Sequence, residues 1–283
     1  MELEDKLSKN KKQKKNKKHY QKDIELEIDL FNYEKNDDTI LNFKNIDYYS
    51  TKDKNVFENK FSKPRNNSQY KLLTCLKKKE YKIVIASGPA GTGKTLFGVE
   101  QGIRNYILGN YEKLIFTRPT VTVDEDLGYL PGTLEEKLNP YIRPIFDILY
   151  NFITPKEVEN LLSEKVIEII PLGFLRGRTF KNCWIVADEM QNSTISQMKM
   201  LLTRLGENSR LVITGDLEQN DLHGVSNGLE DFLNKMKGRR SDSISSIEFD
   251  KSQVEREDIV KEVLEIYETN KIPYNSSDID SDN

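Results

Sequence analysis

The chain has few of the residues from which metal centres, disulfides and membrane spans are built. Only two cysteines, Cys75 and Cys183, and two histidines, His19 and His223, occur in 283 residues. The cysteines lie far apart and match no metal or redox spacing, so we expect reduced thiols in a cytoplasmic protein. No apolar run approaches the roughly 18 residues that a membrane span requires, and the first residues show no apolar segment typical of a secretory signal. We therefore expect no membrane partner.

The chain also lacks a strong net charge, because 43 basic residues face 46 acidic ones. No global field favours nucleic acid or a membrane surface. The charge is unevenly distributed, with seven lysines between Lys9 and Lys18. Such a run cannot pack, so residues 1–62 are predicted to form a largely disordered extension, either a solvated tail or a nucleic-acid tail. Residues 274–283 form an acidic tail that we also expect to be disordered, which leaves 63–273 as the folded core.

Six short apolar runs in the core indicate strands buried on both faces of a parallel sheet, because they are nearly continuous rather than alternating. They are Tyr81–Ser87, Lys113–Thr117, Val166–Leu172, Cys183–Asp188, Arg210–Thr214 and Ser245–Phe249. Helical patterns lie between them. One places Leu96, Val99, Ile103 and Ile107 on one face, and another, Thr194–Leu205, places Ile195, Met198, Leu202 and Leu205 on one face. The alternation predicts an α/β fold, a parallel sheet sandwiched by helices.

The stretch "GPAGTGKT" joins the first of these strands to the first helix. It satisfies the pattern G-x-x-x-x-G-K-[ST] with Gly88, Pro89, Ala90, Gly91, Thr92, Gly93, Lys94 and Thr95. Glycines let successive backbone N–H groups turn toward phosphate oxygens where a Cβ would obstruct. In such a loop the lysine reaches the β- and γ-phosphates and the threonine hydroxyl ligates Mg²⁺. The sequence thus predicts a P-loop that binds a nucleoside triphosphate.

An acidic pair follows a later strand in the stretch "WIVADE". Asp188 and Glu189 come at its carboxyl end, where ligands of open α/β sheets collect. We expect Asp188 to hold Mg²⁺ and Glu189 to polarise a water that attacks the γ-phosphate. A glutamate in this position favours hydrolysis over phosphorylation of a small molecule.

Two further stretches resemble helicase-like ATPases. In "VITGDLEQNDL", Asp216 and Gln219 follow another strand, where a polar side chain could sense the γ-phosphate. Upstream, Gln69 precedes the P-loop strand, an arrangement that resembles the adenine-reading glutamine of helicases. A glutamine amide can pair with the amino group and N7 of adenine. The alternative for Gln69 is an ordinary surface residue.

Taken together, these stretches resemble the PhoH-like ATPases, which have a single helicase-like, RecA-type core of the P-loop NTPase class. The resemblance spans roughly residues 63–268 and rests on "GPAGTGKT", "TRPTV", "LGYLPGTLEEKLNPYIRPIFDIL", "PLGFLRGRTF", "DEMQNSTISQMKMLLTRLG" and "TGDLEQNDL". It implies binding of ATP with Mg²⁺, ATPase activity and action on RNA. Two residues depart from the family pattern: Glu257 stands where a histidine is common, and His223 replaces a proline.

Several arginines are candidates for completing the site. Arg256 keeps its place in the family pattern as a phosphate-facing arginine. Arg176 and Arg178 are candidates for transition-state charge, supplied in trans, or for a nucleic-acid backbone, and ordinary surface arginines are the alternative. Arg118, in "TRP", corresponds to the place where helicase cores contact nucleic acid.

Two functions stay open at this point. One is an ATPase whose cycle remodels RNA or single-stranded DNA, and the other is an ATP-dependent binding switch with slow hydrolysis and a protein partner. The chain has room for one core, and an arginine supplied in trans must come from another copy. We therefore expect a homo-oligomer, a ring.

Overall fold

A computed structural model describes residues 57–119, 143–222, 226–254 and 259. Its centre is a six-stranded sheet with all strands parallel, in the order β3-β2-β4-β5-β1-β6. The strands are β1 (Ile83–Ser87), β2 (Lys113–Arg118), β3 (Ile167–Pro171), β4 (Cys183–Ala187), β5 (Arg210–Gly215) and β6 (Ile244–Glu248). Each lies where the sequence predicts a strand, with ends that differ by one or two residues.

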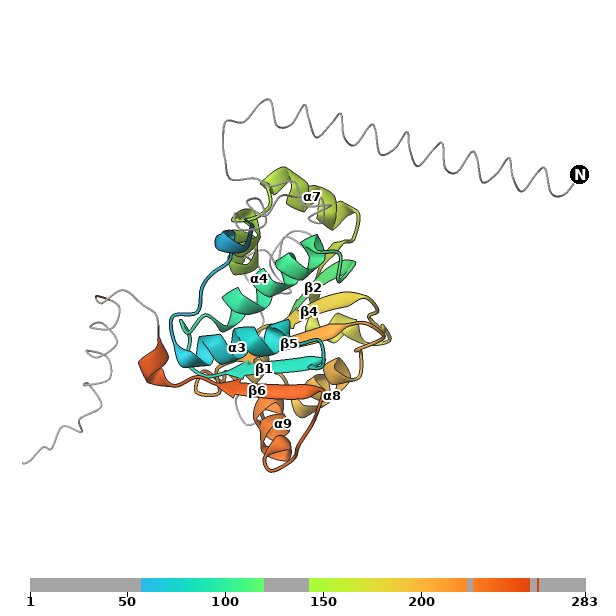
Figure 1. The fold of residues 1–283 in the computed structure, drawn as a ribbon. Helices are drawn as coiled ribbons and strands as arrows, with labels where there is room; N and C mark the ends of the chain where they lie inside the picture. Colours follow the sequence, from blue (N-terminus) through green and yellow to red (C-terminus); the bar gives the residue numbers. More distant parts are fainter. Residues whose placement is uncertain (1–56, 120–142, 223–225, 255–258, 260–283) are drawn as a thin grey trace, which may run out of the picture.

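Helices cover both faces of this sheet (Figure 1). One face carries α3 (Asn67–Lys77) and α4 (Lys94–Ile107), and α7 (Pro155–Ser163) packs beside β3. The other face carries α8 (Ile195–Leu202), α9 (Gly228–Met236) and the short 3-10 turns η2 (Leu172–Leu175) and η3 (Met190–Asn192). A last turn, η4 (Lys251–Gln253), follows β6. The predicted fold class, a parallel sheet between helices, is confirmed.

The continuous apolar character of the strands follows from burial on two sides. In β1, Val84 and Ala86 belong to the core under α3 and α4, whereas Ile83 and Ile85 belong to the core under α8 and α9. Successive side chains of a strand point to opposite faces, so a strand covered on both faces needs apolar residues at every position.

Helix α4 packs closely on β4 because two of its residues are glycines. A Cβ on Gly102 would lie 2.7 Å from Cδ1 of Trp184, and the indole Nε1 donates to the carbonyl of Gly98 at 3.1 Å. Val99, Ile103 and Ile107 are buried as the sequence predicts. The close approach places the first turn of α4, and with it the glycine-rich loop, firmly against the sheet.

Helix α8 begins as predicted and ends earlier. The capping box of Thr194 and Gln197 is present, with both reciprocal hydrogen bonds. The helix ends at Leu202 rather than Leu205, and Ile195, predicted to face the core, is 38% exposed. The prediction for Ile195 is wrong because the face toward the sheet runs through Met198 and Leu201.

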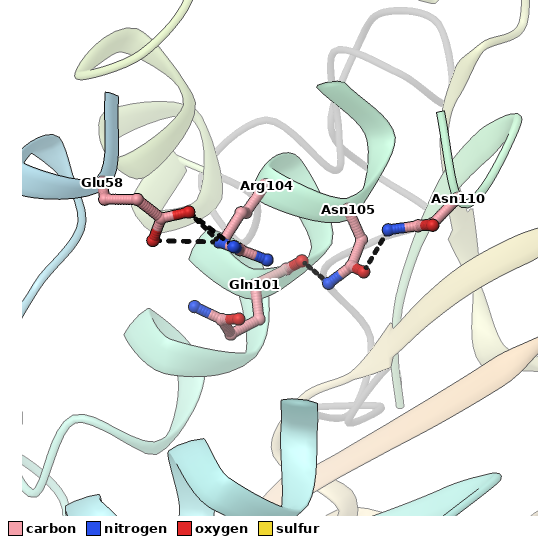
Figure 2. Close-up of polar contacts among 5 residues, drawn as sticks. All are labelled: Glu58, Gln101, Arg104, Asn105 and Asn110. Atoms are coloured by element: carbon pink, nitrogen blue, oxygen red, sulfur yellow. Dashed lines mark hydrogen bonds and ion pairs between the residues drawn. The ribbon is translucent and has the colours of Figure 1, made fainter. Parts of the chain in front are cut away.

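Residues 57–62 pack on α4 ahead of the predicted start of the core at residue 63. Phe57 and Phe61 are buried, and Phe61 stacks on Phe152 with ring centroids 4.8 Å apart. Glu58 pairs with Arg104 of α4, on the same helix as the Gln101–Asn105 contact shown in Figure 2. The packed core therefore reaches back to at least Phe57.

Candidate active site

Because all six strands are parallel, their carboxyl ends meet at one edge of the sheet. The glycine-rich loop follows β1, Asp188 follows β4, and Asp216 follows β5. In the sheet, β5 lies between β1 and β4, so the three segments follow strands that are neighbours in space. The sequence could place each segment at a strand end, but only the strand order brings them together.

The glycine-rich loop has a backbone that requires glycine. Gly88 has φ +131°, and a Cβ there would lie 2.3 Å from the carbonyl oxygen of Phe249 after β6. Gly93, the N-cap of α4, has φ 83° and provides no side-chain cap. The first N–H groups of α4 are therefore left without a capping side chain, which is the arrangement that suits a phosphate.

Lys94 is 7% exposed, and its ammonium lies inside this loop. Its Nζ donates to the carbonyl oxygens of Gly88 at 2.7 Å and Pro89 at 2.6 Å, and to the Thr92 hydroxyl at 3.2 Å. Burial lowers the pKa of Lys94 below its ordinary value, and the negative charges of three carboxylates oppose the shift; these belong to Asp216, Asp188 and Glu189. The loop thus holds a buried cation that faces acidic groups from two strand ends.

The two residues predicted to hold a metal ion lie in contact. The Thr95 hydroxyl donates to Oδ1 of Asp188 at 2.8 Å, and the hydroxyl of Thr214, on β5, donates to the same oxygen. Within the described ranges, no group of three or more His, Cys, Asp and Glu side chains could hold a metal by itself. The donor set suits Mg²⁺, which takes one or two protein oxygens and completes its shell with phosphate and water.

Glu189 adopts the left-handed backbone region, with φ 53° and ψ 38°. Its Oε2 accepts a hydrogen bond from Nε2 of Gln191 at 2.5 Å. A non-glycine residue in this region is uncommon and directs the side chain away from the path of the strand. The two neighbouring carboxylates therefore have different partners, Gln191 for Glu189 and Thr95 for Asp188.

Asp216 connects the end of β5 to the glycine-rich loop. Its Oδ2 accepts from the backbone N–H of Ala90 at 3.1 Å, and its Oδ1 accepts from the N–H of Glu218 at 3.1 Å. Gln219 closes the same turn, with its N–H donating to the Asp216 carbonyl at 3.1 Å, and its side chain is exposed. Both residues therefore lie at the edge where the loop and the acidic pair meet.

Gln69 is buried, with 4% exposure, so the interpretation as a surface residue is wrong. Its Nε2 donates to the carbonyl of Thr92 at 3.2 Å, and its Oε1 accepts from the N–H of Arg65 at 2.7 Å. The amide thus ties the start of α3 to the glycine-rich loop. One N–H and one lone pair are left for any contact with a base.

The predicted arginines are spread over the molecule. Arg118 ends β2 at the same sheet edge as the loop, and Arg176 is exposed after η2. Arg178 pairs with Glu168 of β3 at 2.8 Å and lies over the ring of Phe180, near the amino ends of the strands. Arg256 lies outside the described residues, as do His223, Glu257 and residues 127–142 of the family blocks.

Two polar residues of the site, Thr214 and Gln191, and one beside it, Asn192, were not predicted from the sequence. Thr214 shares Asp188 with Thr95, Gln191 contacts Glu189, and Asn192 forms a reciprocal pair with Asp221 at 3.2 and 2.9 Å. The sequence signal for Gln191 and Asn192 is that two polar residues directly follow Asp188, Glu189 and Met190. Their burial in a turn could not be read from the sequence.

Comparison with known proteins identifies the family. The family described as PhoH-like protein matches residues 62–268. A PhoH-like protein of Bacillus subtilis (strain 168) is 44% identical over 187 residues, which cover 66% of this chain and 58% of the relative. Protein PhoH of Escherichia coli (strain K12) is 36% identical over 206 residues, which cover 72% of this chain and 57% of that protein. The chain thus spans less than two thirds of the length of these relatives.

Solved structures show a weaker likeness. The Sulfolobus solfataricus SWI2/SNF2 ATPase core, solved in complex with dsDNA, is 16% identical with a TM-score of 0.39, covering 67% of this chain and 45% of that chain. A likeness of this size carries no argument about function. No helix in the described part of the chain is both long and apolar enough to cross a membrane.

The family match covers most of the chain and includes the whole site, and the chain belongs to the PhoH family.

Proposed function

We propose that this chain binds Mg-ATP at the glycine-rich loop and hydrolyses it. The observation that carries the proposal is the contact between the Thr95 hydroxyl and Asp188 at 2.8 Å, which brings the loop and the acidic strand end into one site. Lys94 and Thr95 come from one segment and Asp188 and Glu189 from the other. Hydrolysis of a phosphoanhydride requires a loop that binds the phosphates and, next to it, carboxylates that hold the metal ion and activate water.

Each residue has a distinct role in this proposal. Lys94 exchanges its bonds to loop carbonyls for β- and γ-phosphate oxygens. Thr95 and Asp188 would hold Mg²⁺, which would neutralise charge on those phosphates. Glu189 accepts a proton from the attacking water. Gln219 and Asp216 sense the γ-phosphate, and Gln69 supports the loop or reads adenine.

Variants at two of these positions test the assignment. Lys94→Ala should lose ATP binding, whereas Lys156→Ala, which removes the same charge at an exposed site on α7, should bind as the wild type does. Glu189→Gln should bind Mg-ATP and hydrolyse it about 10²–10⁴-fold more slowly, the usual contribution of a positioned base. Nucleotide affinity and phosphate release are measured on all four proteins. Unchanged binding by Lys94→Ala, or normal turnover by Glu189→Gln, would contradict the proposal.

We further propose that hydrolysis is coupled to RNA or single-stranded DNA. Support comes from Arg118 at the same sheet edge as the nucleotide site and from the seven lysines between Lys9 and Lys18. The alternative is an ATP-dependent binding switch that acts on a protein partner. ATP turnover with and without single-stranded RNA or DNA distinguishes them, because stimulation supports the first and constant slow turnover supports the second.

The working form that we propose is a homo-oligomer, a ring, in which a neighbouring copy supplies an arginine to the γ-phosphate. The arginines to test as donors to a neighbouring site are Arg118, Arg256 and Arg176, of which Arg176 is exposed. Arg178 is a weaker candidate, because Glu168 and the Phe180 ring hold it near the amino ends of the strands.

A further inference from the structure

We propose that Gln191 is a positioning residue that holds Glu189 for water activation and joins it to the turn after β5. This inference rests on the proposed ATPase activity. It concerns a residue to which sequence reasoning assigned no role. Gln191 lies in the 3-10 turn η3, two residues after the glutamate.

The side-chain amide of Gln191 contacts both segments of the site. Its Nε2 donates to Oε2 of Glu189 at 2.5 Å and to the carbonyl oxygen of Gln219 at 3.2 Å. Its Oε1 accepts from the backbone N–H of Asp216 at 3.0 Å. One amide therefore links the proposed catalytic base to both ends of the turn formed by residues 216–219.

These contacts also determine which way the amide faces. The carboxylate of Glu189 and the carbonyl of Gln219 can only accept hydrogen bonds, so the NH₂ group must point toward them. The N–H of Asp216 can only donate, so the amide oxygen must point toward it. Gln191 is 1% exposed, and a buried amide with three partners of matching polarity has a single low-energy orientation.

The end of β5 is shaped to receive this amide. A Cβ on Gly215 would lie 2.6 Å from Cδ2 of Leu229, 2.9 Å from Oε1 of Gln191 and 3.2 Å from the backbone nitrogen of Gln191. A side chain larger than hydrogen at this position would therefore press on both Leu229 and Gln191. Glycine is therefore required at position 215 by the lack of space for a side chain, and not by its backbone conformation.

Two consequences follow for the proposed reaction. The hydrogen bond from Gln191 to Oε2 restricts the orientation of the Glu189 carboxylate. The turn of Asp216 also contacts the glycine-rich loop through the N–H of Ala90. Hydrogen bonds through Asp216 and Gln191 thus connect the glycine-rich loop to the proposed base.

The neighbouring residue Asn192 offers a matched control. It joins the same two segments through its reciprocal bonds to Asp221, but no bond connects its side chain to Glu189. If Gln191 merely fastened the two segments together, loss of either side chain would have a similar effect. If Gln191 orients the base, only its loss should lower the rate of the chemical step.

The experiment uses the full chain with Gln191→Met, Gln191→Glu and Asn192→Ala. Gln191→Met keeps the length and removes all polar atoms, and Gln191→Glu keeps the acceptor for Asp216 but loses both donors. For both Gln191 variants we expect kcat to fall on the order of 10- to 100-fold, as for other groups that hold a catalytic side chain in place. The Kd for ATP, measured by equilibrium binding, should change by less than about threefold, since Gln191 contacts Asp216 and Gln219 only through their backbone atoms and forms no hydrogen bond with Lys94, Thr95 or Asp188. Asn192→Ala should retain its kcat even if its thermal stability falls.

A double-mutant cycle tests whether Gln191 acts through Glu189. In the Glu189→Gln background, Gln191→Met should cost little further rate in single-turnover measurements, because no base is left to orient. Additive losses would overturn the inference, as would a wild-type kcat in both Gln191 variants or an equal loss of kcat in Asn192→Ala. A wild-type protein without ATP turnover would instead overturn the proposed function, and this inference with it.

Discussion

Lys94 and Gln69 are polar side chains that are buried beside the glycine-rich loop, and each is satisfied by backbone atoms of that loop. The ammonium donates to the carbonyls of Gly88 and Pro89, and the amide donates to the carbonyl of Thr92. Buried polar groups without partners are costly, so these bonds define the conformation of the loop as well as satisfying the side chains. Changing either residue should therefore alter the loop itself.

Gln69→Ala should weaken binding of both ATP and GTP by about 2- to 10-fold, the equivalent of roughly one net hydrogen bond. The reason is that the bond to Thr92 supports the loop whichever base is bound. Affinities for the two nucleotides are compared by competition with a fluorescent analogue. A much larger loss for ATP than for GTP would contradict this expectation and support the adenine reading that the sequence predicts.

Glu100, on α4, carries a carboxyl group whose pKa burial raises above its ordinary value of 4.5, although hydrogen bonds from Ser62 oppose the shift. Its neutral form is therefore favoured in the folded state. The associated stability is present below about pH 4.5 and is lost as the pH rises through the higher folded value. Glu100→Gln keeps partners for Ser62 and removes the charge.

Thermal unfolding between pH 4 and pH 8 checks this prediction. Relative to the wild type, Glu100→Gln should gain in Tm as the pH increases and level off once the wild-type carboxyl is ionised. A difference in Tm that is constant over the whole range would show that Glu100 does not titrate in this way.

The packing of α4 against β4 depends on the absence of side chains at two glycines. Trp184 is fully buried, and its indole donates to the carbonyl of Gly98 while its ring lies against Gly102. Arg210 also lies over this ring, 5.3 Å from its centroid. The ring is therefore held from several sides and cannot move away from a new atom on α4.

Gly102→Ala should lower the free energy of unfolding by about 2–3 kcal/mol, the cost of overpacking a rigid core. The gain in helix propensity, about 1 kcal/mol, acts in the opposite direction and is smaller. Gly173→Ala is the control, because a Cβ there would meet nothing within 4 Å. Urea unfolding of the two variants gives the difference, and equal stability would show that α4 shifts freely on the sheet.

For the whole molecule, the carboxyl ends of the parallel strands place Arg118 at the same sheet edge as the residues proposed to bind the nucleotide. The proposed ring would bring a neighbouring copy to this edge. An arginine supplied in trans contributes roughly 10³–10⁵ in rate in other NTPases. Assembly and turnover should therefore be linked.

Turnover per chain should rise steeply with protein concentration, and light scattering should show assembly over the same range. Mixing in Lys94→Ala subunits should depress activity by more than simple dilution, because each inactive subunit also contacts a neighbour. A monomer with constant turnover would contradict the shared site and favour the binding switch.

The local elements of this protein could be predicted from the sequence alone. Apolar runs of strand length, helical periodicity and the pattern from Gly88 to Thr95 are properties of neighbouring residues, and the structure has a strand, a helix or a tight loop at each. Asp188 and Asp216 could be placed at strand ends for the same reason. The start of the core is the exception, because the sequence predicts residue 63 and the structure has buried residues from Phe57 onward. Phe57 and Phe61 stand in a polar stretch, so their burial could not be recognised from neighbouring residues.

Only the tertiary structure decided which of these segments meet. The insertion of β5 between β1 and β4 brings Thr214 to Asp188, and the turn after β4 brings Gln191 to Glu189, Asp216 and Gln219. The burial of Gln69 and the exposure of Ile195 were decided in the same way. The physical reason is that strand order and the pairing of buried polar atoms depend on contacts between residues far apart in the chain, whereas periodicity and turn residues report only on their immediate neighbours.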